Sequence, residues 1–353
     1  MVRFSDIVKL RDKATRDEKP EAKGPEEERL WFSDTQMLQI KEGAVPDKAM
    51  PTDDARAMVA GFYEKFLERA QEIRERIKAD KGISPSPILS DLHRIIEKNV
   101  ADELYDYALS IPDDYDKMLV HTVDVTFAAM KVGKGMNYDT KRLLELGLAA
   151  FLENVGMYRI PDNVLNKEGK LNEIELKVIR NHPVESAEIL SRLGSRYRWL
   201  AETALQVHER MDGTGYPKGL KGDEISELAY IVGLIDTYAA MIKNRPYREK
   251  FIQTDAIRSI ISFAKGKFPP RILKVFLTQI SLFPVNTYVR LNNKSIGRVV
   301  ATNKDQPMKP MIEILYDGQG NRLQKREIIH LSENPLLYIV EGIDGDRISG
   351  EQA

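Results

Sequence analysis

The feature that most constrains this chain is an almost unbroken helical periodicity of apolar residues from Asp113 to about Phe283. Apolar residues recur three or four positions apart, and the strict alternation typical of strands is absent. One long irregular segment, Met211 to Ser226, interrupts the pattern, and such a loop inside a helical domain usually has a function. The pattern predicts a compact all-α domain. We expect its helices near residues 114–133, 140–153, 172–181, 184–193, 196–210, 226–243, 253–264 and 269–280.

The flanking regions differ from this domain, which covers residues 113–283. Residues 1–50 are charged and interrupted by prolines, and we expect a mobile arm there. Residues 51–112 predict an N-terminal helical region, with its longest helix at 53–80. This region would be a regulatory module, a dimerisation element or a set of helices packed on the next domain. Residues 284–345 change to short apolar runs separated by turn residues, which predicts a small, barrel-like β module serving as a cap or a protein contact.

Composition excludes several classes of function. The chain has 353 residues, of which 42% are hydrophobic, so it can form a sizeable core, and the fold class should be mainly α. It contains no cysteine, which excludes disulfides, zinc–cysteine sites and thiol nucleophiles. A net charge of −1 gives no overall attraction to DNA. No apolar run is long enough to span a membrane and the N-terminus lacks the apolar core of a signal peptide, so we expect a cytoplasmic protein.

The candidate ligands of a metal are histidines and one aspartate. Three of the five histidines, His121, His182 and His208, fall on different predicted helices of the central domain. Histidines supplied one per helix can build a metal site inside a bundle, although isolated ones are more often ordinary core or surface residues. Asp236 lies in the apolar segment IVGLIDTYAAM, where a carboxylate needs a cation. That cation is a metal or an arginine or lysine side chain.

A phosphate-binding segment is the second candidate. The turn Asp212–Pro217 contains Gly213 and Gly215, which permit backbone geometries closed to other residues. Exposed amides in such a turn can bind a phosphate, and Arg245 and Arg248 further along would suit phosphate oxygens. A solvated helix end explains the two arginines equally well.

Together these residues resemble the HD-GYP family of bacterial metal-dependent phosphodiesterases. HERMDGTGYPKGLKGDEI is similar to the family's GYP segment, IPDNVLNKEGKLNEIELKVIRNHPVESAEIL to its middle segment, and IDTYAAMIKNRPYR to the segment after the loop. The resemblance covers roughly residues 114–282. It implies an HD-domain helical bundle in which two or three iron or manganese ions hold the hydroxide that attacks cyclic di-GMP.

The resemblance also implies site residues. The family's metal ligands match His121, His182, His208 and Asp236, and the substrate-binding residues would be Gly215, Tyr216, Pro217, Arg245 and Arg248. The namesake His-Asp pair corresponds to Glu153-Asn154, in which the glutamate can still bind a metal. Asparagine is a poor bridge between two cations.

Further departures lie close to these ligands. The lysine that usually follows the His-Asp pair is Met157, the first of a pair of histidines is Val207, a ligating glutamate of some members is Lys117, and an acid after Asp236 is Ala239. We therefore expect iron or manganese at reduced occupancy, a single ion, or none.

The sequence thus predicts a divergent HD-GYP protein of bacterial cyclic dinucleotide signalling. We expect it to bind cyclic di-GMP or a partner with little or no hydrolysis. The alternative is an active metal-dependent phosphodiesterase with a remodelled metal site, and a third reading is an interaction protein that binds no nucleotide. A protein partner at the N-terminal helices or the β module, and a homodimer through the helix at 53–80, stay open.

Overall fold

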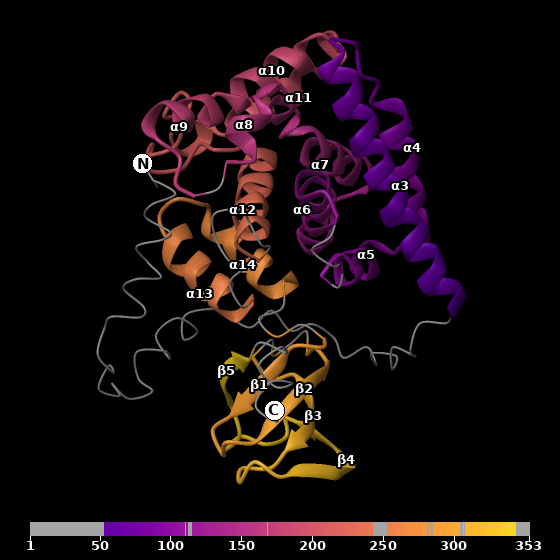
Figure 1. The fold of residues 1–353 in the computed structure, drawn as a ribbon, viewed down its shortest axis with the longest axis vertical. Helices are drawn as coiled ribbons and strands as arrows, with labels where there is room; N and C mark the ends of the chain where they lie inside the picture. The colour runs from indigo at the N-terminus through magenta and orange to yellow at the C-terminus, as the bar shows by residue number, and fades with distance from the viewer. Residues whose placement is uncertain are drawn as a thin grey trace. The chain divides into compact units, whose positions relative to one another are not determined.

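The computed structural model describes residues 53–109, 111, 115–167, 169–242, 253–280, 283, 285–303, 306 and 308–343. The arm predicted at 1–50 and the two candidate arginines, Arg245 and Arg248, lie outside these residues. The described part confirms the mainly α prediction, with helices followed by a small antiparallel sheet (Figure 1). No helix within the described ranges is long and apolar enough to cross a membrane.

The helices follow the predicted order closely. The α-helices are α3 (Asp53–Lys78), α4 (Ser86–Lys98), α5 (Ala101–Ala108), α6 (Lys117–Gly135), α7 (Thr140–Leu152), α8 (Asp162–Leu165), α9 (Glu173–Arg180), α10 (His182–Ser191), α11 (Arg198–Gln206), α12 (Glu227–Ile242), α13 (Gln253–Ala264) and α14 (Pro270–Gln279). Three short 3-10 helices are η1 (Val155–Arg159), η2 (Ser195–Tyr197) and η3 (Gly222–Glu224).

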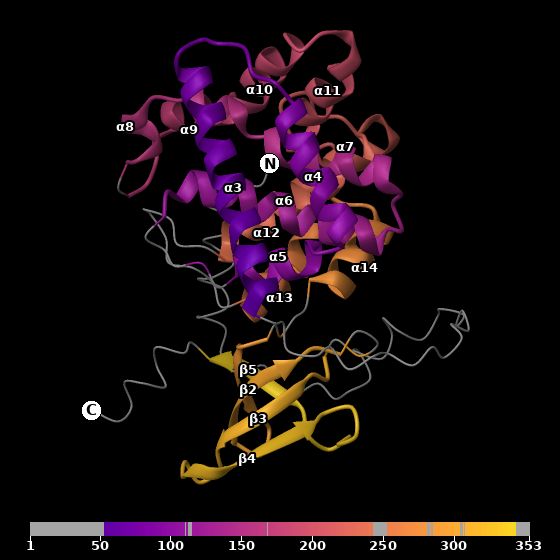
Figure 2. The ribbon, with the colours of Figure 1, turned by 90° about the vertical axis from the view of Figure 1, so that its right-hand side faces the viewer.

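The centre of the helical body is formed by α6 and α12, which run side by side in both views (Figures 1 and 2). Most of their side chains are buried, because each helix is apolar around most of its circumference. Helices α5, α7 and α14 pack around α6, while α10 and α11 contact each other at one end of the body. The core therefore surrounds the two helices on which His121 and Asp236 lie.

The N-terminal helices share this core. Phe66 of α3 packs against Phe127 of α6 and Phe151 of α7, with ring centroids 5.1 and 5.5 Å apart. The Tyr63 hydroxyl donates to a carboxylate oxygen of Asp124 at 2.8 Å, in a buried position. Helix α4 packs on α7. These contacts place α3 and α4 against the helices that carry the candidate ligands.

One helix ends earlier than the sequence predicts. The apolar pattern predicts a helix over 196–210, but α11 ends at Gln206 and His208 lies in the turn that follows. The backbone amide of Tyr216 donates to the carbonyl of His208 at 3.2 Å, and the Arg210 guanidinium donates to the carbonyls of Val207 and Glu209. These hydrogen bonds replace the next helical turn.

The C-terminal module consists of β1 (Tyr288–Leu291), β2 (Ile296–Ala301), β3 (Met311–Tyr316), β4 (Arg322–His330) and β5 (Ile339–Ile343). All neighbouring pairs are antiparallel and the described order is β4-β3-β2-β1-β5. The pairing register shifts within three of the four strand pairs, and such bulges bend a sheet. The described strands thus form a bent sheet with β4 and β5 at its edges, where the sequence predicts a barrel-like module.

Candidate metal centre

Five side chains from five separate segments meet inside the helical body. His121 lies on α6, Glu153 directly follows α7, and His182 is the first residue of α10. His208 lies in the turn after α11, and Asp236 lies in the middle of α12. The structure therefore brings together every metal ligand that the sequence predicts, although they span more than 110 positions of the chain.

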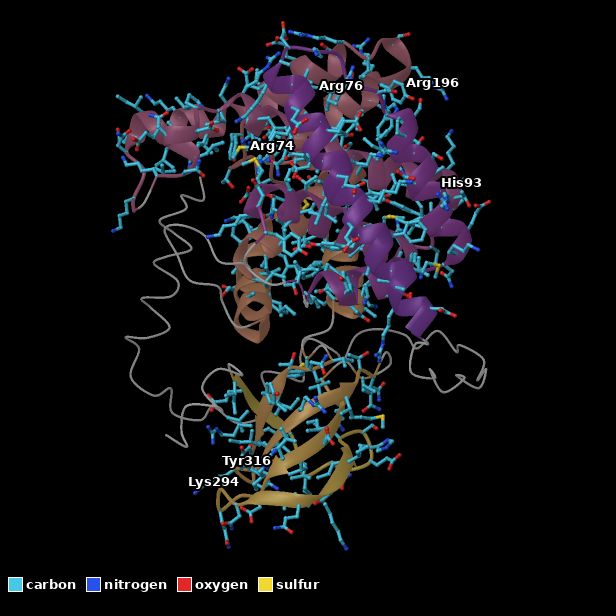
Figure 3. All side chains as sticks on the ribbon, turned by 45° about the vertical axis from the view of Figure 1, so that its right-hand side comes forward. Arg74, Arg76, His93, Arg196, Lys294 and Tyr316 are labelled. Atoms are coloured by element: carbon cyan, nitrogen blue, oxygen red, sulfur yellow. The ribbon has the colours of Figure 1, made fainter. Side chains whose placement is uncertain are left out.

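The other two histidines lie elsewhere. His93 is on the outer face of α4 with its side chain about half exposed (Figure 3), where it faces Glu97 at 3.5 Å. His330 ends β4 and is also partly exposed. These two residues are ordinary surface histidines and provide a control for any test of the cluster.

The imidazoles of the cluster are held in defined orientations. Nε2 of His121 donates to Oδ1 of Asp236 at 2.8 Å. Nδ1 of His182 donates to the carbonyl of Ile179 at 2.7 Å, which leaves Nε2 of the same ring as an acceptor. That Nε2 lies 2.9 Å from Nε2 of His208. A histidine whose second nitrogen is fixed by a carbonyl is the arrangement commonly found at metal sites.

Glu153 connects two overlapping groups of ligand atoms. The ligand atoms of Glu153, His182 and His208 lie within 4.8 Å of one another, and so do those of His121, Glu153 and Asp236. Oε2 of Glu153 and Nδ1 of His121 are buried without a hydrogen-bond partner in the described part of the chain. Buried polar atoms are normally satisfied, so these two indicate a ligand that completes the site.

Electrostatics favour a cation at this position. Burial, and then the charge of Asp236, raises the pKa of Glu153 well above its ordinary value. Burial, and then the neighbouring His182, lowers the pKa of His208 to about 3, and burial also lowers the pKa of His182. The imidazoles of His182 and His208 therefore favour the neutral form, which is the form that binds metals.

The donor set fits a divalent ion. Three imidazoles and two carboxylates form a mixed nitrogen and oxygen donor set, which suits iron or manganese better than it suits a soft metal. The two unpartnered atoms, Oε2 of Glu153 and Nδ1 of His121, belong to residues of this set. The identity of the ion does not follow from the side chains.

Two glycines bring the ligand-bearing segments together. A Cβ on Gly156 would overlap the carbonyl oxygen of His182, and the Gly156 amide donates to the hydroxyl of Ser186 at 2.8 Å. A Cβ on Gly215 would overlap the backbone of Glu209 and Arg210. Only glycine permits these close approaches, so both segments sit directly against the turn or helix that carries a histidine ligand.

The loop that carries the GYP residues lies against the cluster. The ring of Tyr216 stacks on His208, with centroids 4.9 Å apart and planes 10° apart. The Arg180 guanidinium lies 5.6 Å from the centre of the Tyr216 ring. Pro217, the next predicted substrate-binding residue, is exposed. Arg180 was not among the sequence candidates, and its position two residues before His182 is the signal that could have identified it.

The interior of this loop is held by Glu209, which was not among the residues predicted from the sequence. Glu209 is buried, and its carboxylate accepts hydrogen bonds from the amides of Lys218, Gly219 and Leu220 at 2.6, 3.1 and 3.0 Å. From the sequence alone, a charged residue at this position would be expected to be exposed to solvent. In the folded loop, Glu209 instead binds the backbone amides of residues 218–220.

The family departures have clear structural positions. Val207 is buried and apolar where a histidine is expected, and Ala239 is buried in α12. Lys117 begins α6, and Met157 lies in η1. The side-chain amide of Asn154 donates a hydrogen bond to Oε1 of Glu153.

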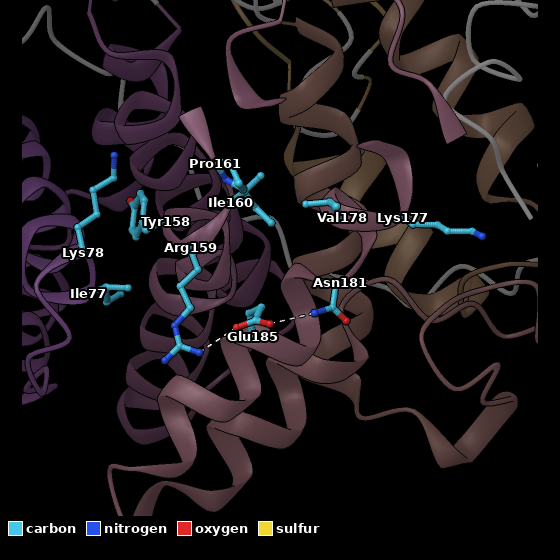
Figure 4. A pocket seen from close by; sticks show the side chains of 10 residues that line it. All are labelled: Ile77, Lys78, Tyr158, Arg159, Ile160, Pro161, Lys177, Val178, Asn181 and Glu185. Carbon is cyan, nitrogen blue, oxygen red and sulfur yellow. Dashed lines mark hydrogen bonds and ion pairs between the residues drawn. The ribbon is translucent and has the colours of Figure 1, made fainter. Parts of the chain in front are cut away.

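A cavity of about 830 Å³ borders α10, the helix that begins with His182 (Figure 4). Its lining comes from the end of α3, η1 and the junction of α9 and α10. The basic side chains Arg159 and Lys78 are already paired there, with Glu185 at 2.8 Å and Asp162 at 3.0 Å respectively. Lys177, a third basic side chain, also belongs to the lining.

Comparison with known proteins agrees with this geometry. A cyclic di-GMP phosphodiesterase of Pseudomonas aeruginosa is 29% identical over 223 residues, covering 63% of this chain and 53% of that protein. A cyclic di-GMP phosphodiesterase of Borreliella burgdorferi is 32% identical over 209 residues, covering 59% and 55%. A 3'3'-cGAMP-specific phosphodiesterase of Vibrio cholerae is 40% identical over 147 residues, covering 42% and 32%. The chain thus spans about half the length of the first two relatives.

A solved structure and two family models define the fold. An HDGYP protein from Bdellovibrio bacteriovorus superposes with a TM-score of 0.53 at 18% identity, covering 65% of this chain and 73% of that one, which supports the fold alone. Residues 288–351 match a KOW domain associated with HD domain. Residues 93–272, more than half of the chain, match the HD domain. The chain therefore belongs to the HD-domain family, as its resemblance to HD-GYP proteins predicts.

Proposed function

We propose that this chain is a metal-dependent phosphodiesterase of cyclic dinucleotides with a remodelled metal centre. The observation that carries the proposal is the pair of overlapping ligand groups that share Glu153. The sequence favours binding without hydrolysis, because Asn154 stands where the family has a bridging aspartate. The position of Glu153 favours the alternative, because its carboxylate belongs to both groups.

The side chains of this chain have distinct roles in the proposal. His121 and Asp236 would hold an ion on one side, and His182 and His208 on the other, with Glu153 common to both. Bound divalent ions would lower the pKa of a water and neutralise charge on the phosphate. The hydrogen bond from His182 to Ile179 fixes the nitrogen that faces the site.

Substrate would lie on the Tyr216 side of the cluster. The Tyr216 ring covers His208 and limits access of water to that imidazole. The Arg180 guanidinium, 5.6 Å from the centre of the Tyr216 ring, would donate to phosphate oxygens or stack on a base. Relatives named as phosphodiesterases of cyclic di-GMP and of 3'3'-cGAMP support the substrate class.

A cyclic dinucleotide receptor without turnover is the second candidate. Two observations favour it: apolar Val207 fills the place of a family ligand, and Met157 replaces the family's lysine. Both changes remove groups that would bind an ion or a phosphate. The GYP loop with Tyr216 would then bind nucleotide while hydrolysis is lost.

The test is hydrolysis of cyclic di-GMP with manganese or ferrous iron, followed by the appearance of the linear product. We expect turnover in the unaltered chain and a loss of at least about 100-fold in His208→Ala and Asp236→Ala, because even outer-shell changes cost 10- to 100-fold at metal sites. His93→Ala, which alters an exposed histidine, should keep full activity.

The outcomes separate the candidates. Saturable nucleotide binding measured by calorimetry, without any linear product, would favour the receptor. Absence of both binding and product would leave an interaction protein, the third reading of the sequence.

A further inference from the structure

Glu153 and Asn154 contact each other in a way that the family pattern does not predict. The Glu153 side chain is only 2% exposed, and it follows the last residue of α7. Its Oε1 accepts a hydrogen bond from the side-chain amide of Asn154. Its Oε2 has no partner among the described residues, and the Glu153 carboxylate contributes an oxygen to both groups of candidate ligand atoms. One oxygen is therefore held by Asn154, and the other is buried without a hydrogen bond from the described part of the chain.

The remaining ligands form two pairs that each group with this carboxylate, and Nδ1 of His208 also lies 4.0 Å from Oδ2 of Asp236. His121 and Asp236 are joined at 2.8 Å, and His182 and His208 at 2.9 Å. With Glu153 added, each pair becomes a set of three protein ligands. Three protein ligands per ion leave coordination positions for water or substrate, as catalytic metal sites require.

The asparagine cannot replace an aspartate as a bridge. Its amide is neutral, so it offers little to two adjacent cations, and its NH₂ group donates rather than accepts. The same NH₂ group is, however, a suitable donor to a carboxylate. The neighbour of the bridge is thus well suited to orient it.

We propose that Glu153 supplies the carboxylate that bridges two divalent ions, and that Asn154 is the positioning residue that orients it. The inference rests on the metal centre of the proposed function but not on hydrolysis. The bridge has moved by one position along the chain, from the second residue of the pair to the first. The Glu153 side chain is one methylene longer than aspartate, which supplies reach from its position at the end of α7.

The test measures metal binding without nucleotide. Protein stripped of metal is titrated with MnCl₂, the ions per chain are counted by elemental analysis, and electron paramagnetic resonance distinguishes an exchange-coupled manganese pair from an isolated ion. We expect two coupled ions per chain in the unaltered protein. Glu153→Gln should lose the coupled signal and retain at most one ion, because an amide cannot bridge.

Asn154 and a surface histidine complete the comparison. Asn154→Ala should keep two coupled ions but bind them about 10- to 100-fold more weakly, since it removes only an outer-shell partner. His93→Ala should match the unaltered protein. Circular dichroism of each metal-free variant checks folding. If Glu153→Gln fails to fold, Glu153→Asp keeps the charge with a shorter reach and should weaken the coupling.

Two results would overturn the inference: a coupled pair that persists in Glu153→Gln, or a single ion in the unaltered chain. The failure of the proposed function is separate. Two coupled ions without hydrolysis would support the bridging role of Glu153 and reject the phosphodiesterase activity. Hydrolysis by a protein that binds one ion would support the phosphodiesterase activity and reject the bridge.

Discussion

The loop over residues 209–226 and the ligand cluster beneath it satisfy their polar groups in opposite ways. In the loop, Glu209 accepts three backbone amides, and Asp212 accepts from the amide and hydroxyl of Thr214 at 2.9 and 2.6 Å. In the cluster, buried atoms of Glu153 and His121 have no partner within the described ranges. The loop is complete as protein alone, whereas the cluster needs a ligand to complete it.

The largest effect should come from the centre of the loop. We expect Glu209→Gln to lower the free energy of unfolding by about 2–4 kcal/mol, because the amide replaces a charged acceptor of three hydrogen bonds and turns a donor toward the amides. Urea denaturation measures this change. Glu202→Gln, which alters an exposed i,i+4 ion pair with Arg198, should change stability by less than about 0.5 kcal/mol.

A small effect of Glu209→Gln would break the comparison. A loss below about 1 kcal/mol would mean that water replaces the carboxylate and that the loop is not closed by its own side chains.

The cluster should respond to pH in the metal-free protein. The pKa of His208 is lowered to about 3 from an ordinary value of 6.5, so between these values the unfolded chain binds a proton that the folded chain does not. The contribution of His208 to the free energy of unfolding should therefore fall as pH drops from about 6.5, by up to about 1.4 kcal/mol per pH unit, whereas the raised pKa of Glu153 contributes in the opposite direction. Urea denaturation at pH 7.5, 6.5 and 5.5 measures this slope.

Two variants sharpen the assignment of that slope. His208→Gln should flatten it, although buried His182, whose pKa is also lowered, keeps part of it. His93→Gln should leave it unchanged, because that side chain is about half exposed. An unaltered slope in His208→Gln would show that the cluster does not control acid sensitivity.

The edge of the loop should contribute least. Asp212→Ala removes the side-chain acceptor for Thr214 in an exposed turn, and we expect a loss of about 0.5–1 kcal/mol in urea denaturation. Asp223→Ala, which removes another exposed carboxylate of the same loop, provides the matched control. If Asp212→Ala equals Glu209→Gln, the centre and the edge of the loop are not distinct.

The helices were predictable because their signal is local. The apolar period locates α12 and α13 almost to the residue, since a buried helix repeats its pattern over several turns. The end of α11 was not predictable from the sequence, because it is set by hydrogen bonds from Tyr216 and Arg210 to the turn around His208. Strand β4 was also missed, since its sequence RLQKREIIH is mostly polar and lacks a clear apolar alternation.

The candidate metal ligands were predictable only through resemblance to a family. Spacing alone leaves His121, His182 and His208 as three separate histidines, because their meeting depends on the packing of α6, α10 and α11. Resemblance identified the five residues that the structure brings together. It did not identify the contact between Asn154 and Glu153, because a family pattern compares positions and says nothing of side chains that bind each other.

The close approach of Gly156 to the His182 carbonyl has a practical consequence for redesign. The backbone that follows residues 153 and 154 is held by this contact and by the hydrogen bond to Ser186, neither of which involves the side chains at those two positions. The pair Glu153→His with Asn154→Asp would therefore install the family's ligand chemistry on an unchanged main chain. Old and new metal chemistries could then be compared within one scaffold, separating the effect of the ligands from the effect of the fold.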